Sequence, residues 1–134
     1  MSPPNTALTR IAAVQMVSGS DLQTNLQTAE HWVREAHRQG ASLVLLPEYF
    51  CLMGKKDTDK CAIAEPEGTG PQSPIQARMA ALAGALGIWL AAGTIPLQSS
   101  TPPRIRNSLL VYNPKGESVA CYDKLHLFSF QNGQ

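Results

Sequence analysis

The pattern of apolar residues along the chain predicts several short strands. Residues 43–46 are four consecutive aliphatic residues bounded by Gly40 and Pro47, a run typical of a strand buried on both faces in a parallel sheet. Segments 10–16 (R-I-A-A-V-Q-M) and 88–95 (I-W-L-A-A-G-T-I) are similarly apolar and are expected to form two more strands. Pro47 has no backbone donor, so the strand at 43–46 should stop there and a loop should begin at Glu48.

A helix is predicted between the first two strands. Ser20 and Gln23 have the spacing of a capping box, with Ser20 as the N-cap. Gly40 is expected just beyond the last turn. Apolar residues at spacings of three and four would form the buried stripe: Leu22, Leu26, Ala29, Val33 and Ala36. Strand, helix and strand at this spacing indicate a βαβ unit.

A second helix is predicted before the third strand. Ser73 and Gln76 again have capping-box spacing, and Pro74 takes the favoured first helical position. Gly87 is expected to end this helix. Its buried stripe would be Ile75, Met79, Leu82 and Leu86.

The last third of the chain changes to a hairpin pattern. Segments 106–112 and 118–122 flank Asn113-Pro114-Lys115-Gly116, a sequence that favours a type I turn. Residues 51–70 lack periodicity and are interpreted as a long loop, a feature that tends to be functional in compact domains. The fold class is therefore α/β with a mixed sheet.

Both predicted helices are expected on one face of this sheet, although its strands are apolar on both sides. Such strands require a second covering layer, which the sequence does not supply. We therefore expect a partner chain or further residues to cover the sheet. Residues 1–9 are interpreted as an amino-terminal tail and residues 10–134 as the first part of a single domain.

Composition narrows the function classes. The net charge of +1, with basic residues scattered along the chain, argues against nucleic-acid binding. No apolar stretch approaches the roughly 18 residues that a membrane span requires, and no signal peptide is visible. Three cysteines without a C-x-x-C pair suit a reducing compartment, so a cytoplasmic location is expected. His31 and His37 are six residues apart, and we predict no metal and no organic cofactor.

Two ionisable residues stand at strand ends, where α/β sheets usually place ligands. Glu48 follows the strand at 43–46, and Lys124 follows the strand at 118–122. By position alone, Glu48 could equally cap a turn, and a lysine at a strand end is more often a solvated terminus. The residues around them carry more information.

L-P-E at 46–48, A-G-T at 92–94 and Y-D-K-L-H-L-F at 122–128 together resemble the nitrilase superfamily of carbon–nitrogen hydrolases. Further similarities are A-V-Q at 13–15, Asn25-Leu26, Gly40-Ala41, and Asn107 at the start of its strand. The branch with the greatest similarity contains amidases that act on deaminated glutathione and on ω-amides of 2-oxo acids.

The resemblance implies a four-layer α-β-β-α sandwich, of which this chain would be half, and a Glu–Lys–Cys triad. Glu48 matches the general base and Lys124 the cation that stabilises the oxyanion. A triad of this kind hydrolyses an amide with a thiolate that has a base in reach and with a preorganised positive charge for the developing oxyanion. The implied substrate is a small-molecule amide, and members often form oligomers.

The sequence departs from the family at the nucleophile, which follows the K-x-H-L-F segment in a C-Y-D-x-R-F-P-E motif that does not occur here. Cys121 is expected to pack in the sheet, and Cys51 to be accessible in the loop with only Glu48 to activate it. Neither matches the nucleophile position, so the chain alone is expected to be inactive. The alternatives are a non-catalytic module that pairs with another chain through its bare sheet, and one half of a split enzyme.

Overall fold

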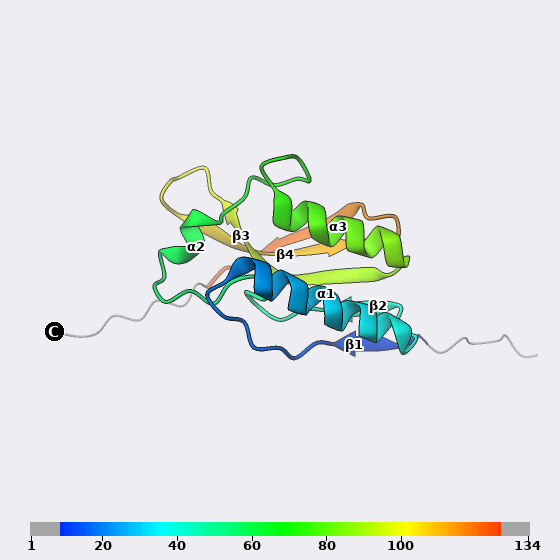
Figure 1. Cartoon of the computed structure of the whole chain (residues 1–134). Coiled ribbons are helices and arrows are strands. Elements are labelled where there is room, and N and C mark those ends of the chain that lie inside the picture. The colour runs from blue at the N-terminus through cyan, green and yellow to red at the C-terminus, as the bar shows by residue number, and fades with distance from the viewer. Residues whose placement is uncertain (1–8, 127–134) are drawn as a thin grey trace, which may run out of the picture.

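The computed structural model describes residues 9–126. The predicted tail at 1–9, apart from its last residue, and the end of the 122–128 segment lie outside this range. Five strands form one sheet in the order β1-β2-β3-β4-β5, and helices α1 and α3 lie together against one side of it (Figure 1). The elements are β1 (Ile11–Ala13), α1 (Leu22–Arg38), β2 (Leu43–Leu45), α2 (Asp59–Ala62), α3 (Pro74–Leu86), β3 (Trp89–Gln98), β4 (Ile105–Tyr112) and β5 (Ser118–Asp123).

The sheet is mixed, as the sequence predicts. β1, β2 and β3 are parallel, and β4 and β5 are antiparallel to their neighbours. In the predicted hairpin turn, the backbone N–H of Gly116 donates to the carbonyl oxygen of Asn113 at 2.9 Å. The first strand is shorter than predicted, ending at Ala13 rather than Met16, whereas β3 extends three residues further, to Gln98.

Both predicted helices form, but their amino ends differ from the predicted capping boxes. Asp21, not Ser20, is the N-cap of α1, and its Oδ1 accepts from the backbone N–H of Thr24 at 2.7 Å. Ser73 does occupy the N-cap position of α3, yet its hydroxyl donates to the carbonyl oxygen of Pro66. In both cases a carboxylate takes the capping role, because its negative charge suits the positive end of a helix.

The carboxylate that caps α3 belongs to Glu65, in the segment predicted to be a structureless loop. Its oxygens accept from the backbone N–H groups of Ile75 at 2.6 Å and Gln76 at 3.1 Å. Glu65 also pairs with β3 through a bridge to Leu97, and the short helix α2 precedes it. Through Glu65, the segment is therefore hydrogen-bonded to both α3 and β3.

The hydrophobic core lies between the sheet and the two helices. Val44 and Leu46 of the β2 segment and Leu90 and Ala92 of β3 point into it and are buried.

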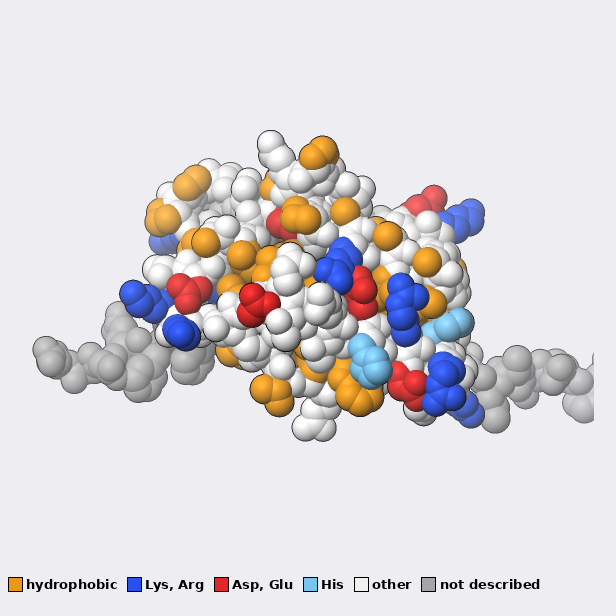
Figure 2. Space-filling model, in the orientation of Figure 1, with side chains coloured by type: hydrophobic (Ala, Val, Ile, Leu, Met, Phe, Trp, Pro, Cys, Tyr) orange, Lys and Arg blue, Asp and Glu red, His pale blue; other side chains and the backbone are white. Residues whose placement is uncertain are grey.

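Figure 2 views the helix side of the molecule, where Lys and Arg side chains lie beside Asp and Glu side chains among the apolar ones.

The opposite face of the sheet is uncovered in the described part of the chain. It carries Ile11, Leu45, Trp89 and Tyr122, with Leu45 42% and Tyr122 57% exposed. The register places Ile11, Leu43 and Trp89 side by side on neighbouring strands. The prediction of one bare, apolar sheet face is confirmed for residues 9–126. Among these residues, no helix combines the length and hydropathy that a membrane crossing requires.

Candidate active site

The structure brings together the two residues that the sequence singles out. Glu48 lies in the turn after β2 and Lys124 directly follows β5, 76 residues later in the chain. The Lys124 Nζ donates to Glu48 Oε1 at 2.8 Å, which makes a charge-assisted contact. The two side chains are 50% and 37% exposed, so the pair is open to molecules from outside.

A third residue, Asn107 of β4, completes this polar cluster. Its Nδ2 donates to the same Glu48 oxygen at 2.7 Å, and its carbonyl oxygen accepts from the backbone N–H of Lys124 at 2.9 Å. In the sequence, Asn107 was only a point of resemblance and was not predicted as a site residue. Apart from that resemblance, its polar side chain within β4 was a weak signal, because its neighbours Arg106 and Ser108 are polar as well.

The environment of Glu48 favours its ionised form. The hydrogen bond from Lys124 lowers the pKa of Glu48, and the bond from Asn107 lowers it further. Partial burial raises this pKa, but the net effect keeps it below its ordinary value of 4.5. The carboxylate is therefore ionised at neutral pH and can accept a proton.

The turn that carries Glu48 is fixed by β3. The backbone N–H of Tyr49 donates to Thr94 Oγ1 at 2.8 Å, and Tyr49 itself has a φ of 50°, which is uncommon for a residue with a side chain. Backbone strain of this kind is often found at functional sites. The side chain of Thr94, in the A-G-T segment at 92–94, thus supports the backbone of this turn.

The Glu48–Lys124 pair lies between two hollows. One, of about 190 Å³, opens on the side of the long loop and is lined in part by Lys60 and Tyr49. The Lys60 Nζ lies 3.8 Å from the ring centroid of Tyr49. The other, of about 400 Å³, opens on the bare face of the sheet, between Leu45, Leu109 and Tyr122. The uncovered sheet face therefore gives direct access to the two charged groups.

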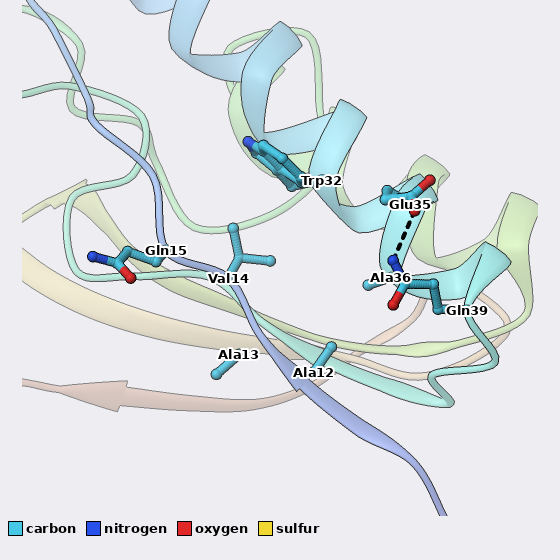
Figure 3. Close-up of a pocket in the computed structure, with 8 residues that line it drawn as sticks. All are labelled: Ala12, Ala13, Val14, Gln15, Trp32, Glu35, Ala36 and Gln39. Carbon is cyan, nitrogen blue, oxygen red and sulfur yellow. Dashed lines mark hydrogen bonds between the residues drawn. The ribbon is translucent and has the colours of Figure 1, made fainter.

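A separate hollow of about 270 Å³ lies between β1 and α1 (Figure 3). Its one ionisable side chain, Glu35, accepts hydrogen bonds from Arg38 and from Gln39. None of the predicted site residues reaches it. We assign it no chemistry.

The cysteines do not complete the cluster. Cys51 was expected to be accessible, but its side chain is fully buried, and burial raises the pKa of its thiol to about 12. The expectation was wrong because the segment after Glu48 turns inward and packs Phe50, Cys51 and Leu52 into the core. Such a thiol stays protonated and unreactive.

Cys121 was expected to pack in the sheet, but it is exposed, because β5 is the edge strand and no helix within residues 9–126 packs closely on it. Partial burial still raises the pKa of its thiol. Its neighbour is the carboxylate of Asp123, 3.9 Å away, rather than Glu48. Cys61 is exposed and lies near the carbonyl oxygen of Pro103. In residues 9–126, no group of three or more His, Cys, Asp or Glu side chains could hold a metal ion.

Comparison with known proteins assigns this sequence to one family. The sequence profile described as "Carbon-nitrogen hydrolase" matches residues 10–134. The chain is 35% identical to a deaminated glutathione amidase of Synechocystis over 118 residues, which are 87% of this chain and 42% of that protein. It is 32% identical to the chloroplastic omega-amidase of Arabidopsis thaliana, covering 95% of this chain and 34% of that protein.

Solved structures agree in fold. One of them is a mutant of the amidase from Nesterenkonia sp. AN1 that shows Michael addition of acrylamide at the active-site cysteine. This chain superposes on it with a TM-score of 0.74 at 26% sequence identity. The match covers 91% of this chain and 46% of that one. The chain therefore spans less than half the length of each of these relatives.

Proposed function

Because the chain belongs to the carbon–nitrogen hydrolase family, we propose that it supplies two of the three catalytic groups of an amidase. Glu48 is the general base, Lys124 stabilises the oxyanion, and the nucleophile is a cysteine contributed from outside these 134 residues. The observation that carries the proposal is the 2.8 Å contact between Lys124 Nζ and Glu48 Oε1, beside a hollow that opens on the bare sheet face.

The charges at this cluster suit amide hydrolysis. Glu48 is ionised at neutral pH, so it can take the proton of a thiol as the sulfur attacks the amide carbon. The electron pair of the C=O bond then moves to oxygen, where the ammonium of Lys124 offsets the new negative charge. When the C–N bond breaks, the nitrogen leaves as ammonia with that proton and a thioester remains. Water then hydrolyses the thioester to a carboxylate, and the thiol is restored.

The bare sheet face is where the missing group would enter. The hollow at Glu48 and Lys124 is bounded by side chains of that face, and a layer packed on it would also exclude water from the site. A dry site strengthens the interaction of Lys124 with an oxyanion. The relatives are named for deaminated glutathione and for ω-amides, and we propose a small-molecule amide of that kind as substrate.

The decisive experiment compares this chain with the longest product of its gene. Purified residues 1–134 should release no ammonia from an ω-amide such as succinamate. A longer product, or this chain mixed with a separately encoded second half, should release ammonia and lose that activity on Glu48→Gln or Lys124→Met substitution. Release by residues 1–134 alone, abolished by Cys51→Ala, would contradict the proposed inactivity. No release by any longer form would contradict the amidase proposal.

A second candidate function is a non-catalytic module that pairs with another chain through its sheet. The specific observation that favours it is the contiguous apolar face of Ile11, Leu45, Trp89 and Tyr122, since exposed patches of this kind mark interfaces. Light scattering during size-exclusion chromatography tests it. Oligomers that a Trp89→Lys variant disrupts would support pairing, whereas a monodisperse monomer with cooperative unfolding would exclude it.

A further inference from the structure

Asn107 is bonded to both residues of the proposed catalytic pair. Its side-chain nitrogen donates to Glu48 Oε1, and its carbonyl oxygen accepts from the backbone of Lys124. These contacts join the turn after β2 to the end of β5 through a single residue of β4. Any shift of Asn107 would therefore change the position of Glu48 relative to Lys124.

The side-chain oxygen of Asn107 has no hydrogen-bond partner within residues 9–126. The residue is 2% exposed, and its Oδ1 is buried without a hydrogen bond from any residue in the described part of the chain. A carboxylate can only accept, so the amide nitrogen must be the atom that faces Glu48. An unpaired buried acceptor destabilises the fold, a penalty that an apolar side chain of similar size avoids. The favourable contribution of this side chain is thus its donor to Glu48.

Both donors contact the same oxygen of Glu48. Lys124 Nζ and Asn107 Nδ2 lie 2.8 Å and 2.7 Å from Oε1, whereas Oε2 accepts no hydrogen bond from a residue within 9–126. An oxygen that already accepts two strong bonds is poorly placed to take a proton. The second oxygen keeps its lone pairs available.

We propose that Asn107 is a positioning residue that fixes Glu48 by Oε1 against Lys124 and reserves Oε2 for the proton of the attacking thiol. The proposal rests on the proposed role of Glu48 as the general base. Oε2 gains the proton as the sulfur electron pair forms the bond to the amide carbon, so the carboxylate becomes a neutral acid and later returns the proton to the leaving nitrogen. In this proposal Asn107 acts through Glu48 and Lys124 and neither gives nor takes the transferred proton.

A pH titration by nuclear magnetic resonance tests this on residues 1–134, without any need for activity. In the wild-type chain, the side-chain amide protons of Asn107 should shift with the same midpoint as the carboxyl carbon of Glu48. Asn107→Leu removes the donor and should raise the pKa of Glu48. Ser108→Ala is the matched control, because the Ser108 hydroxyl donates to Asp123 at 2.6 Å. It should raise the pKa of Asp123 and leave that of Glu48 unchanged.

The proposal would be overturned if the chemical shifts of the Asn107 side-chain amide protons did not change as Glu48 titrates. It would also be overturned if the pKa of Glu48 were unchanged in Asn107→Leu. If that variant fails to fold, the wild-type amide signal still decides. In an active longer product, Asn107→Leu should lower kcat by about 100-fold and move the acid limb of the kcat/KM profile to higher pH. Inactivity of every form would instead count against the amidase function, and the titration would still report on the Glu48–Asn107 bond.

Discussion

Gly93 lies against the carbonyl oxygen of Pro47, where β3 passes the end of β2. A β-carbon at position 93 would overlap that oxygen and would stand 2.7 Å from the carbonyl oxygen of Leu46. Gly93 also has a φ of 30°, a conformation that side chains disfavour. This close approach lets the next residue, Thr94, accept the hydrogen bond from Tyr49 that supports the turn carrying Glu48.

Replacement of Gly93 by alanine should therefore disturb both the sheet and the site. The overlapping atoms belong to the backbone, which cannot move aside as a flexible side chain can, so we expect a loss of about 3 kcal/mol in the free energy of unfolding. Urea denaturation monitored by circular dichroism measures this. Gly70→Ala is the control, because a β-carbon there would meet no atom within 4 Å. Equal stability of the two variants would refute the packing argument.

The contact between Glu48 and Lys124 should make stability depend on pH. Because the bond from Lys124 holds the pKa of folded Glu48 below its unfolded value, the pair stabilises the fold at neutral pH. This contribution is lost as pH falls below about 4.5 and Glu48 becomes protonated. Both side chains are more than a third exposed, so solvent screening limits the contribution to about 1 kcal/mol or less.

The expected result for Lys124→Met is a stability deficit at pH 7 that disappears near pH 2. Lys115→Met, at an exposed hairpin position, should show no such dependence on pH. Chemical denaturation at a series of pH values gives both curves. A deficit of Lys124→Met that is constant from pH 7 to pH 2 would show that the pair contributes nothing to the linkage.

Glu65 should contribute far more to stability than its charged neighbour Glu67. Glu65 is 3% exposed, and its carboxylate accepts from two backbone N–H groups at the start of α3 and from the side chain of Gln76. Glu65→Ala leaves these buried donors unpaired, and we expect a loss of about 3 kcal/mol. Glu67, about half exposed, forms a surface ion pair with Arg106, so Glu67→Ala should cost less than about 1 kcal/mol. Urea denaturation of the two variants side by side would disprove the capping role if their losses were equal.

The sequence predicts the order of strands and helices well because each buried element has an unbroken apolar pattern. The parallel β1–β2–β3 core and the βα connections follow from segments such as 43–46 and from Gly40 and Gly87, which adopt positive φ values beyond the helix ends. The helix caps were predicted less well, since the pattern favoured Ser20 and Ser73. The capping groups are Asp21, one residue on, and Glu65, brought from a segment with no periodicity.

In the candidate site, too, some residues could be predicted from the sequence and others could not. Glu48 and Lys124 could be predicted because each directly follows a strand and has a recognisable local motif. Asn107 could not, because its role depends on the register between β3, β4 and β5, which is set by pairing across the sheet rather than by neighbours in sequence. The burial of Cys51 was missed for a related reason: the direction of the turn after Glu48 depends on contacts with β3 and the core.

The three cysteines should differ sharply in reactivity. Cys51 is fully buried and the pKa of its thiol is raised to about 12, whereas Cys61 and Cys121 are exposed. Because only the thiolate attacks alkylating reagents, iodoacetamide at pH 8 should modify two cysteines of the native chain and all three in denaturant. Cys61 should react faster than Cys121, since partial burial and the nearby carboxylates of Glu67 and Asp123 raise the pKa of the Cys121 thiol.

Intact mass spectrometry counts the added groups, and peptide mapping identifies them. Cys51→Ala should leave the native count at two and lower the denatured count to two, which makes it the matched control for the assignment. Rapid modification of Cys51 in the native chain would mean that the segment after Glu48 opens readily. The thiol nearest to Glu48 in sequence would then be accessible to it, and the proposal that the nucleophile comes from outside these 134 residues would lose its main structural support.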